Sequence, residues 1–121
     1  MRKYSKAVLL IDDNADDLFL FSRELKKLGF KVVATSSAEQ AMSAIVAGSI
    51  GCIVTDQVMP VPGSELVNLI YSVRGDIAAI FLSGAAPQEP LPSGAAFVDK
   101  RDMEKLRTAV QGCMACWQDK G

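Results

Sequence analysis

Short hydrophobic segments alternate along the chain with longer segments in which apolar residues recur at helical spacing. The short segments are continuous apolar runs of the kind found in buried parallel strands, and they predict five strands: residues 7–11, 31–34, 52–56, 78–82 and 96–98. The longer segments predict four helices: residues 15–28, 37–47, 64–73 and 102–118. This alternation is typical of an α/β fold, here one domain with a single doubly wound parallel sheet of five strands.

The predicted helices carry recognisable start and stop signals. Gly29 and Gly48 follow the first two helices, at the position where glycine commonly ends a helix. Ser37 begins a segment with the form of a capping box, which favours a helix start there. Ser64 is expected to cap the third helix, and the apolar face predicted for that helix consists of Leu66, Val67, Leu69 and Ile70.

The connection between the fourth and fifth predicted strands lacks a helical pattern. Residues 84–94 contain three prolines and two glycines. Proline removes an amide donor and disfavours helical backbone in the residue before it, so a regular helix is not expected. We predict a coil or a single turn here, and therefore a fold whose fourth helix is missing or reduced to a turn.

Acidic residues follow two of the predicted strands. Asp12 and Asp13 come directly after the first strand, and Asp56 ends the third. In a sheet of order 2-1-3-4-5 these strands are neighbours, and their carboxyl ends lie where the strand order reverses and ligands bind. Three adjacent carboxylates repel one another strongly, and a hard divalent cation offsets that charge. The pattern therefore predicts a site for Mg²⁺ or Mn²⁺.

Polar residues also follow the last two strands, namely Ser83 and Lys100. A phosphoryl group in transfer needs its oxygens neutralised. Lys100 can supply a positive charge, Ser83 a hydroxyl donor, and Asp56 the nucleophile that forms an acyl phosphate. Taken singly, each residue has an ordinary interpretation, such as a helix cap for Asp12 and Asp13 or a surface position for Lys100. Their joint placement at four strand ends favours phosphoryl chemistry.

These residues, in this order, resemble the receiver domain of two-component response regulators, the CheY-like family. The matching segments, spread over nearly the whole chain, are residues 8–14, 56–60 with Gly63, 83–84 and 97–100. The resemblance implies a flavodoxin-like receiver domain over residues 1–121. The roles that it implies are Asp13 as a direct metal ligand, Asp12 as a ligand mostly through water, Asp56 as phosphoacceptor and metal ligand, the Val58 carbonyl as a further metal ligand, Ser83 and Lys100 as holders of the phosphoryl group, and Ser83 and Phe97 as switch residues.

The resemblance also implies a signalling function. Asp56 is expected to receive a phosphoryl group from a sensor histidine kinase or a phosphotransfer protein. Phosphorylation is then expected to switch a surface that binds a downstream protein or effector domain. The chemistry of such a module is limited to self-catalysed phosphoryl transfer and autodephosphorylation, so it is not a metabolic enzyme. The alternative is a degenerate receiver that binds partners without being phosphorylated.

The chain departs from the family pattern in three places. Arg101 follows Lys100 where the family usually has a proline with a cis peptide bond, and a trans bond is expected because a cis bond before a residue other than proline costs about 3 kcal/mol. The loop between Asp56 and Gly63 is one residue shorter than usual. The missing helix belongs to the family's usual output face, so a different partner surface is expected.

Composition narrows the remaining function classes. The chain has 13 basic and 14 acidic residues, so it lacks the excess of positive charge that is typical of a nucleic-acid binder. No apolar run approaches the length of a membrane span, so the expected location is the cytoplasm. Cys113 and Cys116 match Cys-x-x-Cys, but they fall inside a helical pattern and the chain has no histidine, so we interpret them as structural residues. The lack of histidine also excludes a Ser-His-Asp triad, and no glycine-rich phosphate loop is present.

Overall fold

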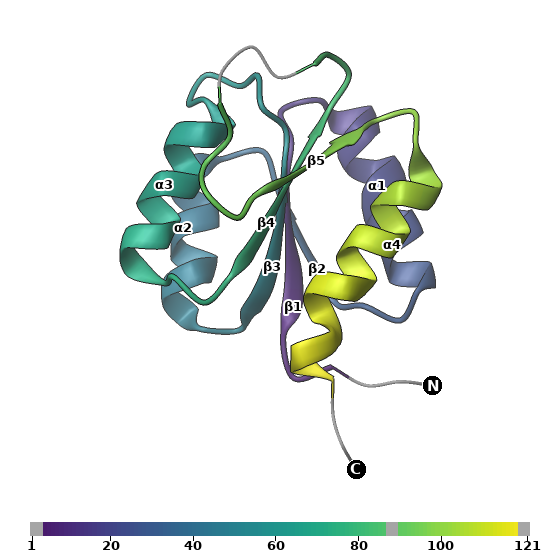
Figure 1. Ribbon diagram of the computed structural model, residues 1–121, viewed down its shortest axis with the longest axis horizontal. Coiled ribbons are helices and arrows are strands. Elements are labelled where there is room, and N and C mark those ends of the chain that lie inside the picture. The colour runs from purple at the N-terminus through teal and green to yellow at the C-terminus, as the bar shows by residue number, and fades with distance from the viewer. Residues whose placement is uncertain (1–3, 87–89, 119–121) are drawn as a thin grey trace.

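One parallel sheet of five strands forms the centre of the molecule in the computed structural model, which describes residues 4–86 and 90–118 (Figure 1). The strands lie in the order β2-β1-β3-β4-β5. They are β1 (Ala7–Ile11), β2 (Val32–Thr35), β3 (Ile50–Thr55), β4 (Ala78–Ser83) and β5 (Ala96–Asp99). The helices are α1 (Ala15–Lys27), α2 (Ala38–Ala47), α3 (Gly63–Val73) and α4 (Met103–Met114), followed by a short 3₁₀ helix, η1 (Ala115–Trp117). The predicted α/β class and strand order are confirmed.

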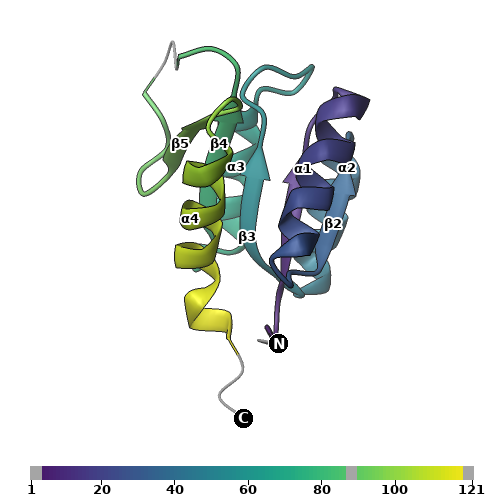
Figure 2. The ribbon, with the colours of Figure 1, turned by 90° about the vertical axis from the view of Figure 1, so that its right-hand side faces the viewer.

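Each face of the sheet buries its own set of side chains. Every residue of β1 and β3 is buried, as expected for central strands that are covered on both sides. Because side chains alternate along a strand, Leu9 and Ile53 pack with α2 and α3, whereas Val8 and Val54 pack with α1 and α4. Figures 1 and 2 show these helix pairs on opposite faces. The carboxyl ends of the strands therefore remain as an open edge where polar groups can gather.

The ends of the helices largely follow the sequence signals. Asn14 caps α1, Ser37 caps α2 and Asp102 caps α4, and each side chain accepts a hydrogen bond from the backbone N–H three residues later. Gly29 and Gly48 follow α1 and α2 with φ of 94° and 85°, the left-handed conformation that ends a helix at low cost for glycine. These caps fix where each helix begins relative to the edge of the sheet.

The start of α3 differs from the prediction. The helix begins at Gly63 rather than after Ser64, and its N-cap residue is Pro62, which provides no side-chain hydrogen bond. The Gly63 N–H instead donates to the backbone carbonyl of Gln57, at 3.1 Å. The predicted cap at Ser64 is therefore wrong, because the short loop after Asp56 turns into the helix two residues earlier.

The buried face of α3 is also narrower than predicted. Leu66, Val67 and Ile70 are fully buried, but Leu69 is 50% exposed. At helical spacing, residue 69 lies about 100° around the axis from the mean direction of the three buried residues. Its side chain therefore points away from the sheet, and its assignment to the core face is wrong.

The connection from β4 to β5 contains no helix within its described residues, 84–86 and 90–95. A turn is present instead, in which the Ala95 N–H donates to the Pro92 carbonyl at 3.0 Å. Leu91, Ala95 and Phe97 are partly buried against the core on the side of α2 and α3. These residues thus cover part of the surface that a crossover helix would otherwise occupy. The predicted coil with a turn is confirmed for the described residues, while residues 87–89 of the predicted segment lie outside them.

The final helix is shorter than predicted. It changes to η1 after Met114, and the Trp117 indole N–H donates to the Gly51 carbonyl at 3.1 Å, which holds η1 against the start of β3. Cys113 lies half-buried on α4 and Cys116 lies exposed in η1, both as free thiols. Among the described residues, no helix combines the length and hydrophobicity required to cross a membrane.

The rotation of α3 can be tested with two leucines. Leu66→Ala is expected to lower the free energy of unfolding by about 2–5 kcal/mol, because it leaves a cavity between α3 and the sheet. Leu69→Ala removes the same atoms from the same helix but is expected to change it by less than about 0.5 kcal/mol. Urea unfolding followed by far-UV circular dichroism measures both values, and equal losses would contradict the described orientation of α3.

Candidate functional site

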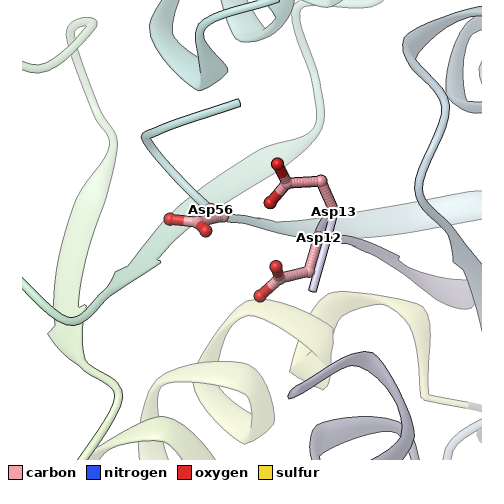
Figure 3. Close-up of side chains that lie close together, drawn as sticks. All are labelled: Asp12, Asp13 and Asp56. Carbon is pink, nitrogen blue, oxygen red and sulfur yellow. The ribbon is translucent and has the colours of Figure 1, made fainter. Parts of the chain in front are cut away.

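Two backbone contacts bring the three aspartates together at the carboxyl edge of the sheet. The Asp56 N–H donates to the Ile11 carbonyl at 2.9 Å, which places Asp56 directly beside the end of β1. Asp12 follows Ile11, and its N–H donates to the Thr35 carbonyl of β2 at 3.2 Å. Asp12, Asp13 and Asp56 each offer one carboxylate oxygen, and these oxygens lie within 4.8 Å of one another (Figure 3). The predicted convergence of the acidic residues is therefore present in the structure.

The three carboxylates differ in their exposure to solvent. Asp12 is 2% exposed and Asp56 is 9% exposed, whereas Asp13 is exposed. Burial raises the pKa of Asp12, and hydrogen bonds from the Lys100 ammonium and the Asn14 N–H only partly offset this effect. The Asn14 N–H lies 2.9 Å from Asp12 Oδ1. Asp12 is thus a poorly solvated carboxylate whose ionised form depends on neighbouring positive charge.

Lys100 supplies that positive charge. Its ammonium lies 2.8 Å from Asp17 Oδ2, 2.9 Å from Asp12 Oδ2 and 3.2 Å from Asp56 Oδ2. Burial alone would lower the pKa of Lys100, but the hydrogen bonds to Asp17, Asp12 and Asp56 outweigh it and hold that pKa above its usual value. Lys100 therefore stays protonated at neutral pH and links β5 to the acidic edge.

Asp17 is the one member of this group that sequence reasoning missed. It lies in the first turn of α1, is partly buried and makes the shortest of the three contacts with Lys100. An aspartate in the first turn of a helix is common for electrostatic reasons alone, so its type and position gave little signal. Its place one helical turn after Asp13 was the only indication that it could face the same edge.

The loop that carries Lys100 has a trans backbone that side chains hold in place. No cis peptide bond occurs among the described residues, so the Lys100–Arg101 bond is trans, as predicted. The Arg101 N–H donates to Asp99 Oδ1 at 2.8 Å, and the Arg101 guanidinium binds both oxygens of the same carboxylate. These hydrogen bonds lower the pKa of Asp99. The Lys100 N–H donates to the Ser83 carbonyl at 3.0 Å, which joins the ends of β4 and β5.

The other predicted site residues surround the acidic edge at different depths. Ser83 is 3% exposed, and its Oγ accepts a hydrogen bond from the Ala85 N–H at 3.3 Å. The Val58 N–H donates to Asp56 Oδ1 at 3.3 Å, while the Val58 side chain is exposed. Phe97 lies partly buried on β5. The assignment of Ser83 to phosphoryl binding, of the Val58 carbonyl to the metal and of Phe97 to a switch stays a prediction.

A hollow of about 440 Å³ separates the Asp56 loop from the β4 end. Its lining includes Gln57, Val58 and Met59 from the loop, and Ser83 and Ala85 from the other side. The residues directly after Asp56 thus border this space on one side, and Ser83 borders it on the other.

Gly63 allows the short loop to return close to the acceptor residue. A Cβ atom built on Gly63 would collide with the backbone carbonyl oxygen of Asp56. Any side chain at position 63 would therefore push the Asp56 backbone, because that oxygen cannot move independently of the β3 end. The lack of a side chain at Gly63 therefore allows the close approach that sets the position of Asp56.

The donor set fits a small, hard divalent cation. The three aspartates offer carboxylate oxygens, the ligand type that Mg²⁺ and Mn²⁺ prefer. Asp13 is the most accessible of the three to a cation, since it is exposed, whereas Asp12 and Asp56 each bind Lys100 through Oδ2. Among the described residues these three form the only such acidic group of potential metal ligands.

The close approach of Gly63 to Asp56 predicts that a side chain at position 63 lowers stability. Gly63→Ala is expected to lower the free energy of unfolding by about 1–3 kcal/mol, because the new methyl group forces the Asp56 loop outward. Gly84→Ala is the matched control near the same edge, since a Cβ there would meet no atom within 4 Å. Urea denaturation compares the two variants, and a neutral Gly63→Ala would show that the loop relaxes freely.

Metal binding at the aspartates predicts a cation-dependent gain in stability. At a Mg²⁺ concentration 100 times the dissociation constant, the wild type is expected to gain about 2.7 kcal/mol of unfolding free energy. Asp13→Asn is expected to lose most of this gain and to be more stable than the wild type without Mg²⁺, because one repelling carboxylate is gone. Asp16→Asn removes an equal charge from the first turn of α1 and should keep the gain. Thermal unfolding with Mg²⁺ and with a chelator measures it, and an undiminished gain in Asp13→Asn would exclude this cation site.

Comparison with known proteins agrees with the geometry. A family model described as the response regulator receiver domain matches residues 8–111. No curated protein matches the chain. Several solved structures share its fold, however, and three of them illustrate the degree of similarity.

A response regulator receiver protein from Sinorhizobium medicae WSM419 is 26% identical, with a TM-score of 0.80, over 92% of this chain and 95% of that one. A response regulator receiver domain protein from Clostridium thermocellum is 22% identical, with a TM-score of 0.82, over 92% and 95%. The response regulator TrrA from Thermotoga maritima, solved in complex with Mg²⁺-BeF, is 20% identical, with a TM-score of 0.78, over 89% and 98%. The extent of the family match shows that this chain belongs to the response regulator receiver domains.

Proposed function

We propose that this receiver domain is a phosphoacceptor module and that Asp56 accepts a phosphoryl group from a phosphohistidine. The observation that carries the proposal is the environment of the Asp56 carboxylate. Its Oδ2 lies 3.2 Å from the Lys100 ammonium, and the carboxylates of Asp12 and Asp13 lie beside it. The donor would be a sensor histidine kinase or a phosphotransfer protein. Such a donor is active inside the cell, in keeping with the cytoplasmic location expected from the sequence.

The chain's own residues can carry the transfer. A carboxylate oxygen of Asp56 attacks phosphorus in line, the bond from phosphorus to the histidine nitrogen breaks, and its electron pair stays with the imidazole, which takes up a proton. Lys100 stays protonated throughout, and its N–H groups that bind Asp12 and Asp56 turn to donate to phosphoryl oxygens. A bound Mg²⁺ would supply further charge neutralisation for the oxygens. Later attack of water on the acyl phosphate would reset the domain.

Ser83 and Phe97 are proposed to convert this chemistry into a change of surface. The Ser83 hydroxyl borders the hollow next to the Asp56 loop, so a phosphoryl group there could draw it from its contact with Ala85. Phe97 lies partly buried on the neighbouring strand β5 and would turn inward as that loop moves. Shifting a domain from almost all inactive to almost all active requires about 5.5 kcal/mol of differential interaction. New charge-assisted hydrogen bonds to Lys100 and Ser83 are of the kind that could supply it.

A degenerate receiver that acts by binding alone is the second candidate. The observation that favours it is the β4–β5 connection, which has no helix within its described residues and so lacks part of the usual output face. The assembled Asp56, Lys100 and Ser83 favour the phosphoacceptor instead. The downstream partner would in either case be a protein or an effector domain.

Phosphorylation by a small donor tests the proposal directly. Incubation of the wild type with Mg²⁺ and acetyl phosphate is expected to add about 80 Da, because one phosphoryl group forms an acyl phosphate on Asp56. Asp56→Asn and a sample with chelator should show no addition, while Asp16→Asn should behave as the wild type. Intact-protein mass spectrometry detects the adduct. A wild type that stays unmodified would favour the binding module.

A further inference from the structure

The Lys100 ammonium has three N–H donors and three carboxylate partners, which are not equivalent. Asp12 and Asp56 belong to the group of oxygens that could hold a cation, and Asp17 does not. The Asp17 contact is also the shortest, at 2.8 Å. Asp17 is therefore the one of the three carboxylates that lies outside the candidate cation site, so its hydrogen bond to Lys100 does not compete with cation binding.

The first turn of α1 holds Asp17 in a fixed relation to the acidic edge. The Asp17 N–H donates to Asn14 Oδ1 at 3.0 Å, and the Asn14 N–H donates to Asp12 Oδ1 at 2.9 Å. The cap of α1 thus connects Asp17 to Asp12 through two hydrogen bonds. The Asp17 backbone is fixed in this way, and its short side chain leaves the carboxylate little freedom, so it can define the position of the ammonium that it binds.

The Lys100 backbone provides no comparable restraint on the ammonium. The Lys100–Arg101 peptide is trans, and the Asp99–Arg101 pair fixes the main chain around the lysine but makes no contact with its Nζ. Four methylene groups separate that backbone from the ammonium, and each can rotate. The side chain must therefore be oriented by what its Nζ binds.

We infer that Asp17 is a positioning residue that holds the Lys100 ammonium against the acceptor pocket during phosphoryl transfer, an inference that rests on the proposed function of Asp56. One ammonium N–H stays on Asp17. The other two leave Asp12 and Asp56 and donate to oxygens of the incoming phosphoryl group. Asp17 itself contacts neither the phosphoryl group nor the cation.

Kinetics of phosphorylation by acetyl phosphate at saturating Mg²⁺ test the inference. Asp17→Ala is expected to lower the maximal rate about tenfold, because the ammonium loses its fixed position, with the half-saturating acetyl phosphate concentration changed less than about twofold. Asp17→Glu keeps the charge and should recover part of the rate. Asp16→Ala is the matched control from the same turn; none of the ion pairs among the described residues includes Asp16, and its rate should equal that of the wild type.

A second measurement reads the position of Lys100 without any chemistry. In ¹⁵N-lysine-labelled wild type, the Lys100 ammonium should give a resolved NMR signal because its hydrogen bonds slow exchange with water; Lys100→Met assigns it. At saturating Mg²⁺, when the acidic group engages the cation, the signal should persist in Asp16→Ala and disappear in Asp17→Ala. Loss of both signal and rate in Asp17→Ala alone supports the inference.

The outcomes separate this inference from the proposed function. If the wild type is phosphorylated and Asp17→Ala matches Asp16→Ala in rate, Asp17 does not position Lys100 and the proposed function stands. A faster Asp17→Ala would show that Asp17 withholds the lysine from the phosphoryl group, which also overturns the inference. A wild type that takes no phosphoryl group overturns the proposed function, and the positioning role falls with it.

Discussion

Electrostatic repulsion among three carboxylates is the constraint around which this site is built. The backbone pairing of β1 with β3 places Asp56 beside Asp12, and this pairing is fixed because both strands are buried on both faces. The aspartates cannot move apart without breaking the centre of the sheet. The fold therefore requires positive charge at this edge, and the Lys100 ammonium provides it in the absence of a cation.

This requirement explains why elements distant in sequence meet at one ammonium. Lys100 follows β5, which two other strands separate from β1 and Asp12, and its backbone hydrogen bond to Ser83 fixes the main chain at the carboxyl edge. Asp17 approaches from α1 on one face of the sheet. The single positive charge of Lys100 cannot neutralise the four carboxylates of Asp12, Asp13, Asp17 and Asp56. The edge therefore keeps a net negative charge around Asp13. A divalent cation and the lysine can therefore act together at this edge, provided that the lysine keeps a partner outside the cation's ligands.

Strand order and the acidic edge could be predicted because each depends on a strong local signal. Continuous apolar runs predict buried strands, and residues that follow such strands must meet at one edge. Asp17 could not be found in this way, because its contact with Lys100 depends on the rotation of α1 and on the length of a flexible side chain. Leu69 failed for a related reason. An apolar residue next to a buried face looks like core in sequence, and only the axial angle of α3 shows that it is exposed.

The same contacts limit the routes by which a change at Asp56 can spread. Its backbone carbonyl abuts Gly63 and so the start of α3, while its side chain reaches β5 and α1 through Lys100. The β4–β5 connection, without a helix in its described part, offers only Ser83 and the turn before β5. A rigid helix moves as one body, whereas a turn adjusts locally. A change at Asp56 is therefore expected to reach α3 on one face of the sheet and, through Lys100, β5 and α1 on the other face.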